Sequence, residues 1–447
     1  MFDFLRRDQP ADAMVYFAGS APPAADAFGR LRSKGYELAE GRSDEAIWIL
    51  DLKHPVHGDA QLACLRDTPR IDDAIRFAGN ITDSERQAAT GASSAVWLRI
   101  PAHRREILRD RKTLLRIARD VLGDDGVMVL DMSSQLPWSR ASLEDELAHD
   151  ADLDIEALYC IHNVLDDDSP DPGRATVLWT HTHGLERLGR FDIDIVAPDR
   201  TFADTCGEML RGIAMGVLEG TIGPDERRFT FGHPGGDARF VPATDFQRDA
   251  DVQFTRLRDA DEHGDRRSVM CEPVGRKILG FGRGDRPEPL RFARQPPPDQ
   301  FVVFFTNAMT TLISERAKAT LDILRSLMAE FAEFEVVAIV KLGYPTPDDG
   351  REHLWFTAHG IGAETIDATL ENKPFVADLR PGERAERPIE LLTDWMLMTP
   401  VGSITPRSMS AARSLRENAA EIRTLIADGR DRTALEPPGV EDSAQPS

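Results

Sequence analysis

Hydrophobic positions recur along the chain with two different spacings. Apolar residues at helical spacing predict helices over 107–122, 153–162, 203–219, 312–331 and 412–425. Short apolar or alternating runs predict strands over 96–100, 127–130, 175–181, 191–196, 335–341, 353–359, 365–370 and around 394–397. This mixture predicts an α+β fold in at least two domains, with antiparallel or mixed sheets and helices packed on one face.

Glycines, prolines and changes in composition divide this pattern into five segments. Residues 221–300 are rich in Gly, Pro, Asp and Arg, and consecutive prolines at 296–298 favour an extended spacer. The last residues have no apolar period. The predicted segments are an N-terminal α/β subdomain (1–90), an α+β sandwich domain (91–220), a loop-rich connector (221–300), a second α+β domain (301–429) and a disordered tail (430–447).

The charge balance limits the possible partners. The 447 residues include 76 acidic and 54 basic side chains, which gives a formal net charge of −22. Such a surface repels phosphate backbones and anionic lipid, so neither nucleic acid nor a membrane is an expected partner. Most of the charge serves solubility. A basic protein partner is compatible with it, and the sequence leaves the oligomeric state open.

Cysteine usage and hydropathy indicate the compartment. The four cysteines are far apart and form no CxxC pair, so we expect buried thiols in a reducing environment. No run approaches the ~18 apolar residues of a membrane span, and no apolar signal region follows the first ten residues. The predicted location is the cytoplasm.

Two histidines one residue apart are the best candidates for chemistry. His181 and His183 follow Trp179 in a predicted strand, where side chains two apart point to the same side. Two imidazoles with a carboxylate such as Asp192 or Asp194 are able to hold zinc, which would activate water for hydrolysis. The alternative is that the histidines form hydrogen bonds at the end of the strand.

A larger ligand set is also conceivable. Cys160 and His162 lie just upstream and would complete four ligands with His181 and His183. In the helix predicted over 153–162, however, residues two apart diverge by about 200° and chelate one ion poorly. No cofactor is therefore expected, with zinc at His181 and His183 as the alternative.

A similar segment occurs later in the chain, where Trp355, His359 and Gly360 correspond to Trp179, His183 and Gly184. A glycine directly after a strand permits positive φ and a sharp turn. The tryptophans would anchor the strands that precede these turns. The likeness suggests a duplication without proving one.

A third candidate lies near the C-terminus, where Asp394-Trp395 and Arg407 flank a predicted hairpin. An Asp394–Arg407 pair would fix the turn, and this is the favoured interpretation. Alternatively, Trp395 lines a shallow binding face. The candidate functional surface comprises Trp179, His181, His183, Trp355, His359, Asp394, Trp395 and Arg407.

Several motifs in the last domain occur in one order. They are Lys341-Leu342-Gly343-Tyr344, Glu352-His353-Leu354-Trp355-Phe356, Thr369-Leu370-Glu371-Asn372-Lys373-Pro374, Thr393-Asp394-Trp395-Met396 and Gly402-Ser403-Ile404-Thr405-Pro406-Arg407. On these motifs, residues 301–418 resemble the YegJ-like bacterial domain of unknown function. Residues 92–200, with the sequence THTHGL at 180–185, resemble the domain of unknown function often fused before it. The resemblance implies a bacterial cytoplasmic protein and brings no established activity.

These observations favour an uncharacterised, non-catalytic binding or interaction protein, such as an antidote or regulator of a basic protein. One alternative is a metal-dependent hydrolase that uses His181 and His183. Another is a small-ligand sensor with a pocket between two domains. The sequence does not decide whether the protein is an enzyme.

Overall fold

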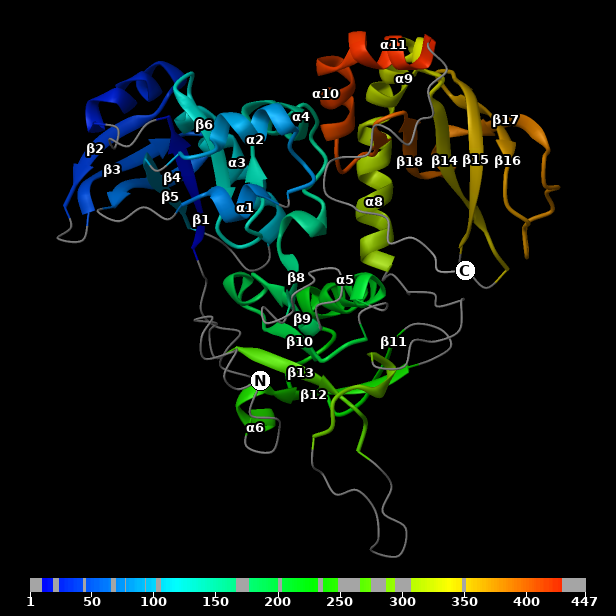
Figure 1. Cartoon of the computed structure of the whole chain (residues 1–447), viewed down its shortest axis with the longest axis horizontal. Coiled ribbons are helices and arrows are strands. Elements are labelled where there is room, and N and C mark those ends of the chain that lie inside the picture. The colour runs from blue at the N-terminus through cyan, green and yellow to red at the C-terminus, as the bar shows by residue number, and fades with distance from the viewer. Residues whose placement is uncertain are drawn as a thin grey trace, which may run out of the picture. The chain divides into compact units, whose positions relative to one another are not determined.

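The protein is an α+β molecule in a computed structural model (Figure 1). The structure describes residues 10–18, 24–42, 46–65, 70–76, 78–92, 94–101, 106–165, 177–199, 203–231, 236–247, 266–274, 287–293, 307–347 and 351–427. These residues form three sheets, of seven, six and six strands. The predicted α+β class with antiparallel or mixed sheets is therefore confirmed.

The first sheet has the strand order β2-β3-β4-β5-β1-β6-β7. Its strands are β1 (Ala11–Phe17), β2 (Glu37–Gly41), β3 (Ala46–His54), β4 (Gly58–Leu65), β5 (Ser94–Ile100), β6 (Gly126–Asp131) and β7 (Pro137–Trp138). The helix α3 (Ile107–Leu122) contacts β1, β5 and β6, and the 3-10 helix η2 (Ala25–Lys34) contacts β2 and β3. α3 buries its apolar stripe, as its periodicity predicts.

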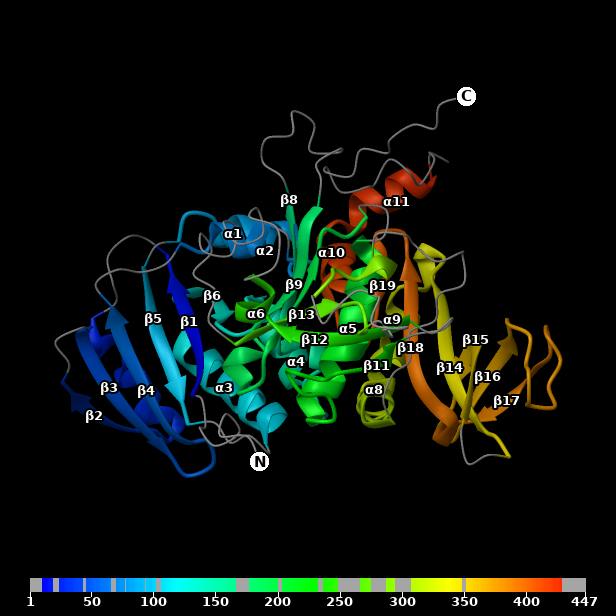
Figure 2. The same cartoon turned by 90° about the horizontal axis from the view of Figure 1, so that it is seen from below.

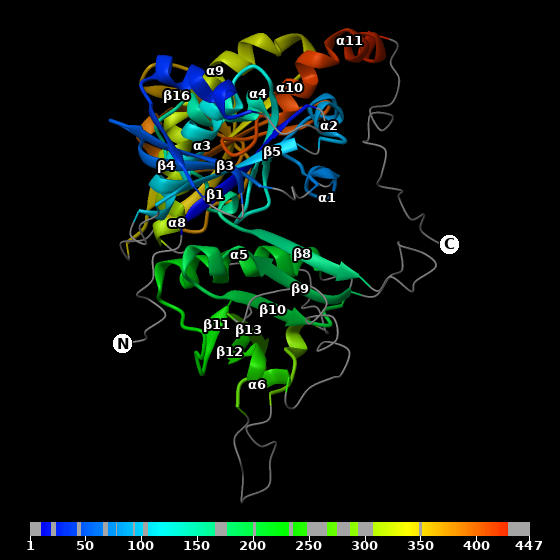
Figure 3. The same cartoon turned by 90° about the vertical axis from the view of Figure 1, so that its left-hand side faces the viewer.

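The second sheet has the order β11-β12-β13-β10-β9-β8 and contains one parallel pair, β10 with β13. Its strands are β8 (Cys160–Leu165), β9 (Val177–His183), β10 (Asp192–Val196), β11 (Phe229–Phe231), β12 (Gly236–Pro242) and β13 (Arg267–Cys271). Figure 3 shows the helices α5 (Ala203–Glu219) and α6 (Ala243–Gln247) on opposite faces of this sheet. The 3-10 helices of this region are η3 (Ile155–Ala157), η5 (Glu186–Leu188) and η7 (Arg291–Ala293).

The third sheet is antiparallel, with the order β17-β16-β15-β14-β18-β19. Its strands are β14 (Val337–Pro345), β15 (Arg351–Ile361), β16 (Thr365–Leu370), β17 (Arg384–Pro388), β18 (Leu392–Thr399) and β19 (Gly402–Ile404). The accompanying helices are α8 (Asn307–Ala319), α9 (Leu321–Glu330), η8 (Ala332–Phe334), η9 (Ile389–Leu391), α10 (Ser410–Glu417) and α11 (Ala419–Ala427). Helices α8 and α9 lie on one side of this sheet (Figure 2), and their apolar residues share a core with alternate strand residues.

The chain forms two compact units, and both are discontinuous in sequence. The first contains residues 1–74, 91–137 and 155–309, with the first two sheets. The second contains residues 310–447 together with two upstream segments, 75–90 and 138–154. These segments carry the helices α2 (Asp83–Ala89) and α4 (Arg140–Leu147). β5 pairs across position 90, the predicted end of the N-terminal subdomain, with β1 and β4.

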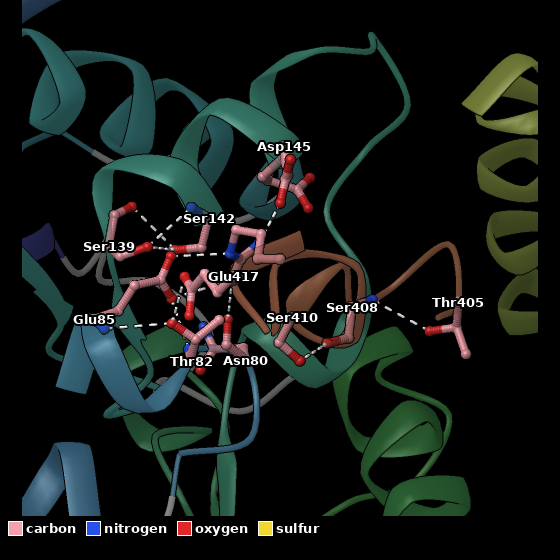
Figure 4. A network of polar contacts seen from close by, with 12 residues as sticks. Asn80, Thr82, Glu85, Ser139, Ser142, Asp145, Thr405, Ser408, Ser410 and Glu417 are labelled. Carbon is pink, nitrogen blue, oxygen red and sulfur yellow. Dashed lines mark hydrogen bonds and ion pairs between the residues drawn. The ribbon is translucent and has the colours of Figure 1, made fainter. Parts of the chain in front are cut away.

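Arg413 of α10 ties both upstream segments to this helix through Glu85 and Asp145. Figure 4 shows these two carboxylates in the polar network. Its Nε lies 2.9 Å from the Glu85 carboxylate, and its Nη1 contacts the Asp145 carboxylate. Its Nη2 donates to the Asn80 carbonyl over 2.6 Å. Glu85 in turn accepts from the Thr82 backbone in a capping box at the start of α2. One guanidinium therefore joins α2, α4 and α10 in a single polar network.

A second buried guanidinium makes a similar connection. Arg316 of α8 forms a bidentate pair with Glu146 of α4, and both side chains are buried. Arg316 also donates to the carbonyls of Pro406 and Asp152, over 2.8 and 3.1 Å. Since its donors reach Glu146 and Asp152 on one upstream segment and Pro406 after β19, Arg316 fixes α4 and the chain after β19 on α8.

Most predicted helices and strands are present, with three differences. The helix predicted over 153–162 is wrong, because a short 3-10 helix is followed there by the strand β8. The predicted loop-rich connector contains β11, β12 and β13, whose apolar residues are few but buried. The helices predicted over 312–331 and 412–425 are each interrupted, the first at Thr320 between α8 and α9 and the second at Asn418 between α10 and α11. The proline spacer at 296–298 and the tail from 430 lie outside the described residues.

Among the described residues, no helix is long and apolar enough to cross a membrane.

The Arg316–Glu146 pair predicts a large loss of stability in Arg316→Ala. A buried carboxylate that loses its guanidinium partner typically costs about 3–5 kcal/mol, so the free energy of unfolding should fall by that order. Urea unfolding of the full chain measures it. Arg423→Ala is the control, because its pair with Glu333 is exposed on both sides and should matter little. Equal effects of the two substitutions would contradict this role for Arg316.

Candidate functional site

The strands β8 and β9 bring the four predicted ligand residues onto one ribbon. Their antiparallel register places Cys160 opposite His183 and His162 opposite His181. Side chains at alternate positions of paired strands share a face. The ring centroid of His162 lies 5.4 Å from that of His181 and 5.9 Å from that of His183. The argument that Cys160 and His162 diverge, which depended on a helix, is therefore wrong.

Cys160 contacts an imidazole but is a weak nucleophile. Its Sγ lies 3.2 Å from Nε2 of His162, and it also contacts the carbonyl oxygen of His183 at 3.7 Å. Burial raises the pKa of the Cys160 thiol to about 12, and the negative charge of Asp192 acts in the same direction. At neutral pH the thiol is protonated, which favours a packed, hydrogen-bonded side chain over a reactive one.

His181 is held by the tryptophan two residues earlier. It is only 1% exposed, and its Nδ1 accepts a hydrogen bond from Nε1 of Trp179. In a neutral imidazole one nitrogen accepts and the other carries the proton, so Nε2 of His181 is the protonated nitrogen. A nitrogen that carries a proton does not coordinate zinc. Trp179 is itself buried against Phe246 and Val269.

His183 and the following glycine contact the end of the first sheet. Nε2 of His183 lies 3.0 Å from the side-chain amide of Gln135. Gly184 has a φ of +114°, and a Cβ placed there would lie 1.9 Å from the Ser133 carbonyl oxygen. The glycine is therefore required both by its backbone conformation and by close approach of another chain segment.

Asp192 organises the turn after β9. Its carboxylate accepts from the Thr182 hydroxyl at 2.9 Å and from the backbone N–H groups of Gly184, Leu185 and Glu186 at 3.3, 3.1 and 3.4 Å. Burial nevertheless raises the pKa of Asp192 to about 6. The threonine, glycine and leucine of the motif thus have structural roles in one turn.

Asp194, the other suggested ligand, is paired with an arginine. Both of its oxygens accept from Arg267 of β13, and the two side chains are almost fully buried. Arg267 also donates to the Thr182 carbonyl over 3.3 Å. The Asp194 carboxylate is therefore paired with the Arg267 guanidinium, which joins β9, β10 and β13.

Among the described residues, no group of three or more His, Cys, Asp or Glu side chains is arranged to hold a metal ion. The four ribbon side chains lie close together, and hydrogen bonds direct them to Trp179, Gln135 and one another. What the arrangement provides is a polar network between two strands.

The second Trp-His-Gly segment has a different structure. Trp355 and His359 lie inside β15, and Gly360 follows a shift in the pairing register instead of beginning a turn. Trp355 is only partly buried and His359 is exposed, where its Nε2 lies 2.8 Å from Thr369 Oγ1. Trp179, by contrast, is in a core. The two segments are therefore not structurally equivalent.

The Asp394–Arg407 pair is present, with 3.9 Å between the guanidinium and the carboxylate. Burial raises the pKa of Asp394, and the nearby Arg407 opposes this shift. Lys341 of β14 lies opposite Asp394 of β18, and the Lys341 amine lies 5.0 Å from the centroid of the Trp355 ring. Trp395 points the other way, into the core, where its Nε1 donates to Thr320.

The side of the third sheet opposite its helical core forms an open face, of which the sequence candidates included Trp355 and His359 but none of its apolar residues on β14 and β18. Val337 and Met398 are register partners and are 42% and 45% exposed. Ile339 and Met396 are the next pair on this face, followed by the Lys341–Trp355 pair. The alternation in β14 and β18 would have indicated this face. Here "open face" denotes Val337, Ile339, Lys341, Trp355, Thr357, His359, Met396 and Met398.

Two family models match parts of this chain. Residues 161–251 match the C-terminal part of a protein of unknown function, DUF4026, and include the β8–β9 ribbon except Cys160. Residues 307–418 match DUF2314, an uncharacterized protein conserved in bacteria, and include the third sheet. The chain thus contains two domains of unknown function. No curated protein and no solved structure matches it.

The raised thiol pKa predicts slow alkylation of Cys160. With a pKa of about 12, only about one thiol in 10,000 is ionised at pH 8. Iodoacetamide should label Cys160, Cys206 and Cys271 far more slowly than free cysteine in the native protein, and fully after denaturation. Mass spectrometry of the labelled peptides measures this. Rapid native labelling of Cys160 would show that it is a reactive thiol.

Asp192 predicts a pH dependence of stability. The pKa of Asp192 in the folded protein, about 6, is above the ordinary 3.8. Its contribution to the free energy of unfolding is therefore complete below about pH 4 and is lost as the pH rises through 6. Relative to Asp192→Asn, the wild type should lose on the order of 3 kcal/mol between pH 4 and pH 7. Urea unfolding of both proteins across this range measures the difference. A constant difference would contradict the raised pKa.

Proposed function

We propose that the chain is a non-catalytic binding protein that captures a basic protein partner on the open face of its C-terminal sheet. The observation that carries this proposal is the adjacent pair Val337 and Met398, which leaves two large apolar side chains nearly half exposed. Ile339, Met396 and Trp355 extend this pair into an apolar strip across three strands. Apolar strips with a polar border are typical of protein interfaces.

Acidic residues border the strip on its β16 and β17 side. Glu371 bonds to the Thr357 hydroxyl, and Asp367 lies beside Glu386 in the register of β16 and β17. Arg384 neutralises Asp367 through two hydrogen bonds. With the net charge of −22, such a border favours encounter with a basic partner and makes association sensitive to salt.

Capture at this face would mask part of the partner, which is what an antidote or a regulator of another protein does. We also propose that residues 301–418 are YegJ-like, on the motifs that carry that resemblance. The metal-dependent hydrolase and the small-ligand sensor remain predictions. Elemental analysis of untagged protein tests the first, and thermal shift against a metabolite panel tests the second.

If the open face binds a basic protein, the wild type should capture a partner in a salt-sensitive way. The double variant Val337→Glu/Met398→Glu should not capture it. The two carboxylates would stand in the apolar strip and would have to be desolvated on binding. Because like charges opposite each other on paired strands are destabilising, circular dichroism checks that the variant folds. Capture from native lysate at low and high salt, with quantitative mass spectrometry, measures the loss for wild type and variant.

The matched control is Val56→Glu, because Val56 is an apolar side chain 80% exposed in the first unit. A basic protein retained by this control and lost by the double variant supports the proposal. Equal capture by all three proteins would contradict it, and so would capture that does not weaken with salt.

A further inference from the structure

We propose that Phe375 and Val376 form a second docking element, a rigid apolar knob that inserts into an apolar pocket of a protein partner. Both residues lie between β16 and β17 in the C-terminal unit. Phe375 is 93% exposed and Val376 is 53% exposed. Burying a phenylalanine side chain is strongly stabilising, and the fold does not use that contribution at this position.

The backbone of this segment is held in place by a single carboxylate. Glu352, at the start of β15, accepts hydrogen bonds from three consecutive N–H groups, those of Phe375, Val376 and Ala377, over 2.5, 3.0 and 2.7 Å. These bonds lower the pKa of Glu352. The carboxylate is therefore ionised at neutral pH, and the three bonds are charge-assisted.

Further contacts hold the segment on both sides of the knob. Before it, the side-chain oxygen of Asn372 accepts from the Trp355 N–H over 2.8 Å. After it, Ala377 and Leu379 pack against the core, and Gly382 donates to the Leu370 carbonyl over 2.8 Å. Ala377 and Leu379 turn toward the core, whereas Phe375, which lies between Asn372 and Ala377, is exposed.

This geometry lowers the entropic cost of binding. A flexible loop would have to be ordered on contact with a partner, and each side chain immobilised in this way weakens binding. The Glu352 carboxylate orders the backbone of the knob in advance. Aromatic side chains that fill a pocket commonly carry much of the energy of an interface. The arrangement therefore fits a preformed anchor that enters a concave, apolar site.

The charge of the chain favours a protein over a lipid surface as the partner. Residues 371–383 carry Glu371, Asp378 and Glu383 against Lys373 and Arg380. Together with Glu352 and the net charge of −22, this composition disfavours approach to anionic lipid. We therefore assign the knob to a protein pocket whose rim is basic.

This inference shares the assumption of a protein partner with the proposed function, but it concerns a different element of the domain. The test places the photo-crosslinker p-benzoylphenylalanine at position 375 of the full chain, in the cells that naturally express it. The crosslinker at position 56, which is 80% exposed, is the matched control. Glu352→Ala in the position 375 protein releases the backbone of the knob and leaves its aromatic group unchanged.

The proposal expects one discrete adduct with a different protein from position 375, absent from position 56 and reduced at least fivefold by Glu352→Ala. Adducts from neither position, equal adducts from both, an adduct with a second copy of the chain, or labelling of lipid would each overturn it. Because Val337 and Met398 are unchanged in these proteins, the knob can fail this test while binding at the open face stands. Loss of the open-face partner alone would leave the adduct intact.

Discussion

Two buried guanidinium groups hold the C-terminal unit together. Arg316 joins α8 to α4, and Arg413 joins α10 to both α2 and α4. Their carboxylate partners come from positions far upstream, so the part of the chain that matches DUF2314 is completed by segments outside that match. A buried arginine requires several partners in defined geometry, and this requirement fixes how the upstream helices are placed within the unit. The third sheet then has its core side covered and its other side available.

The chemistry of the two units follows from how their polar side chains are used. In the first unit, Asp192 and Asp194 are taken up by a turn and by Arg267, and His181 accepts from Trp179. These residues join strands. In the second unit, apolar side chains remain exposed on an ordered sheet and on a loop held by Glu352. The polar cluster therefore supports the fold, and the proposed binding function belongs to the C-terminal unit.

The sequence predicted those features that depend on neighbours along the chain. The stripe of α3 and the alternation of β16 identify these elements because each buries one side regularly. Residues 153–162 were mispredicted because a short apolar run fits either period, and pairing with β9 decided the outcome. β13 was missed because its apolar run is brief. The candidates His181 and His183 lie together, but the Glu352–Phe375 contact spans 23 residues and no local pattern encodes it.

In the proposed function, the C-terminal unit presents an apolar surface that is already ordered before binding. Hydrogen–deuterium exchange of the free full-length protein tests it most directly, read at the amides of Phe375, Val376 and Ala377. Because Glu352 accepts all three N–H groups, these amides should exchange more slowly than an unstructured peptide despite the exposure of Phe375, and Glu352→Gln should accelerate them. Exchange at the unstructured rate in the wild type would contradict the claim.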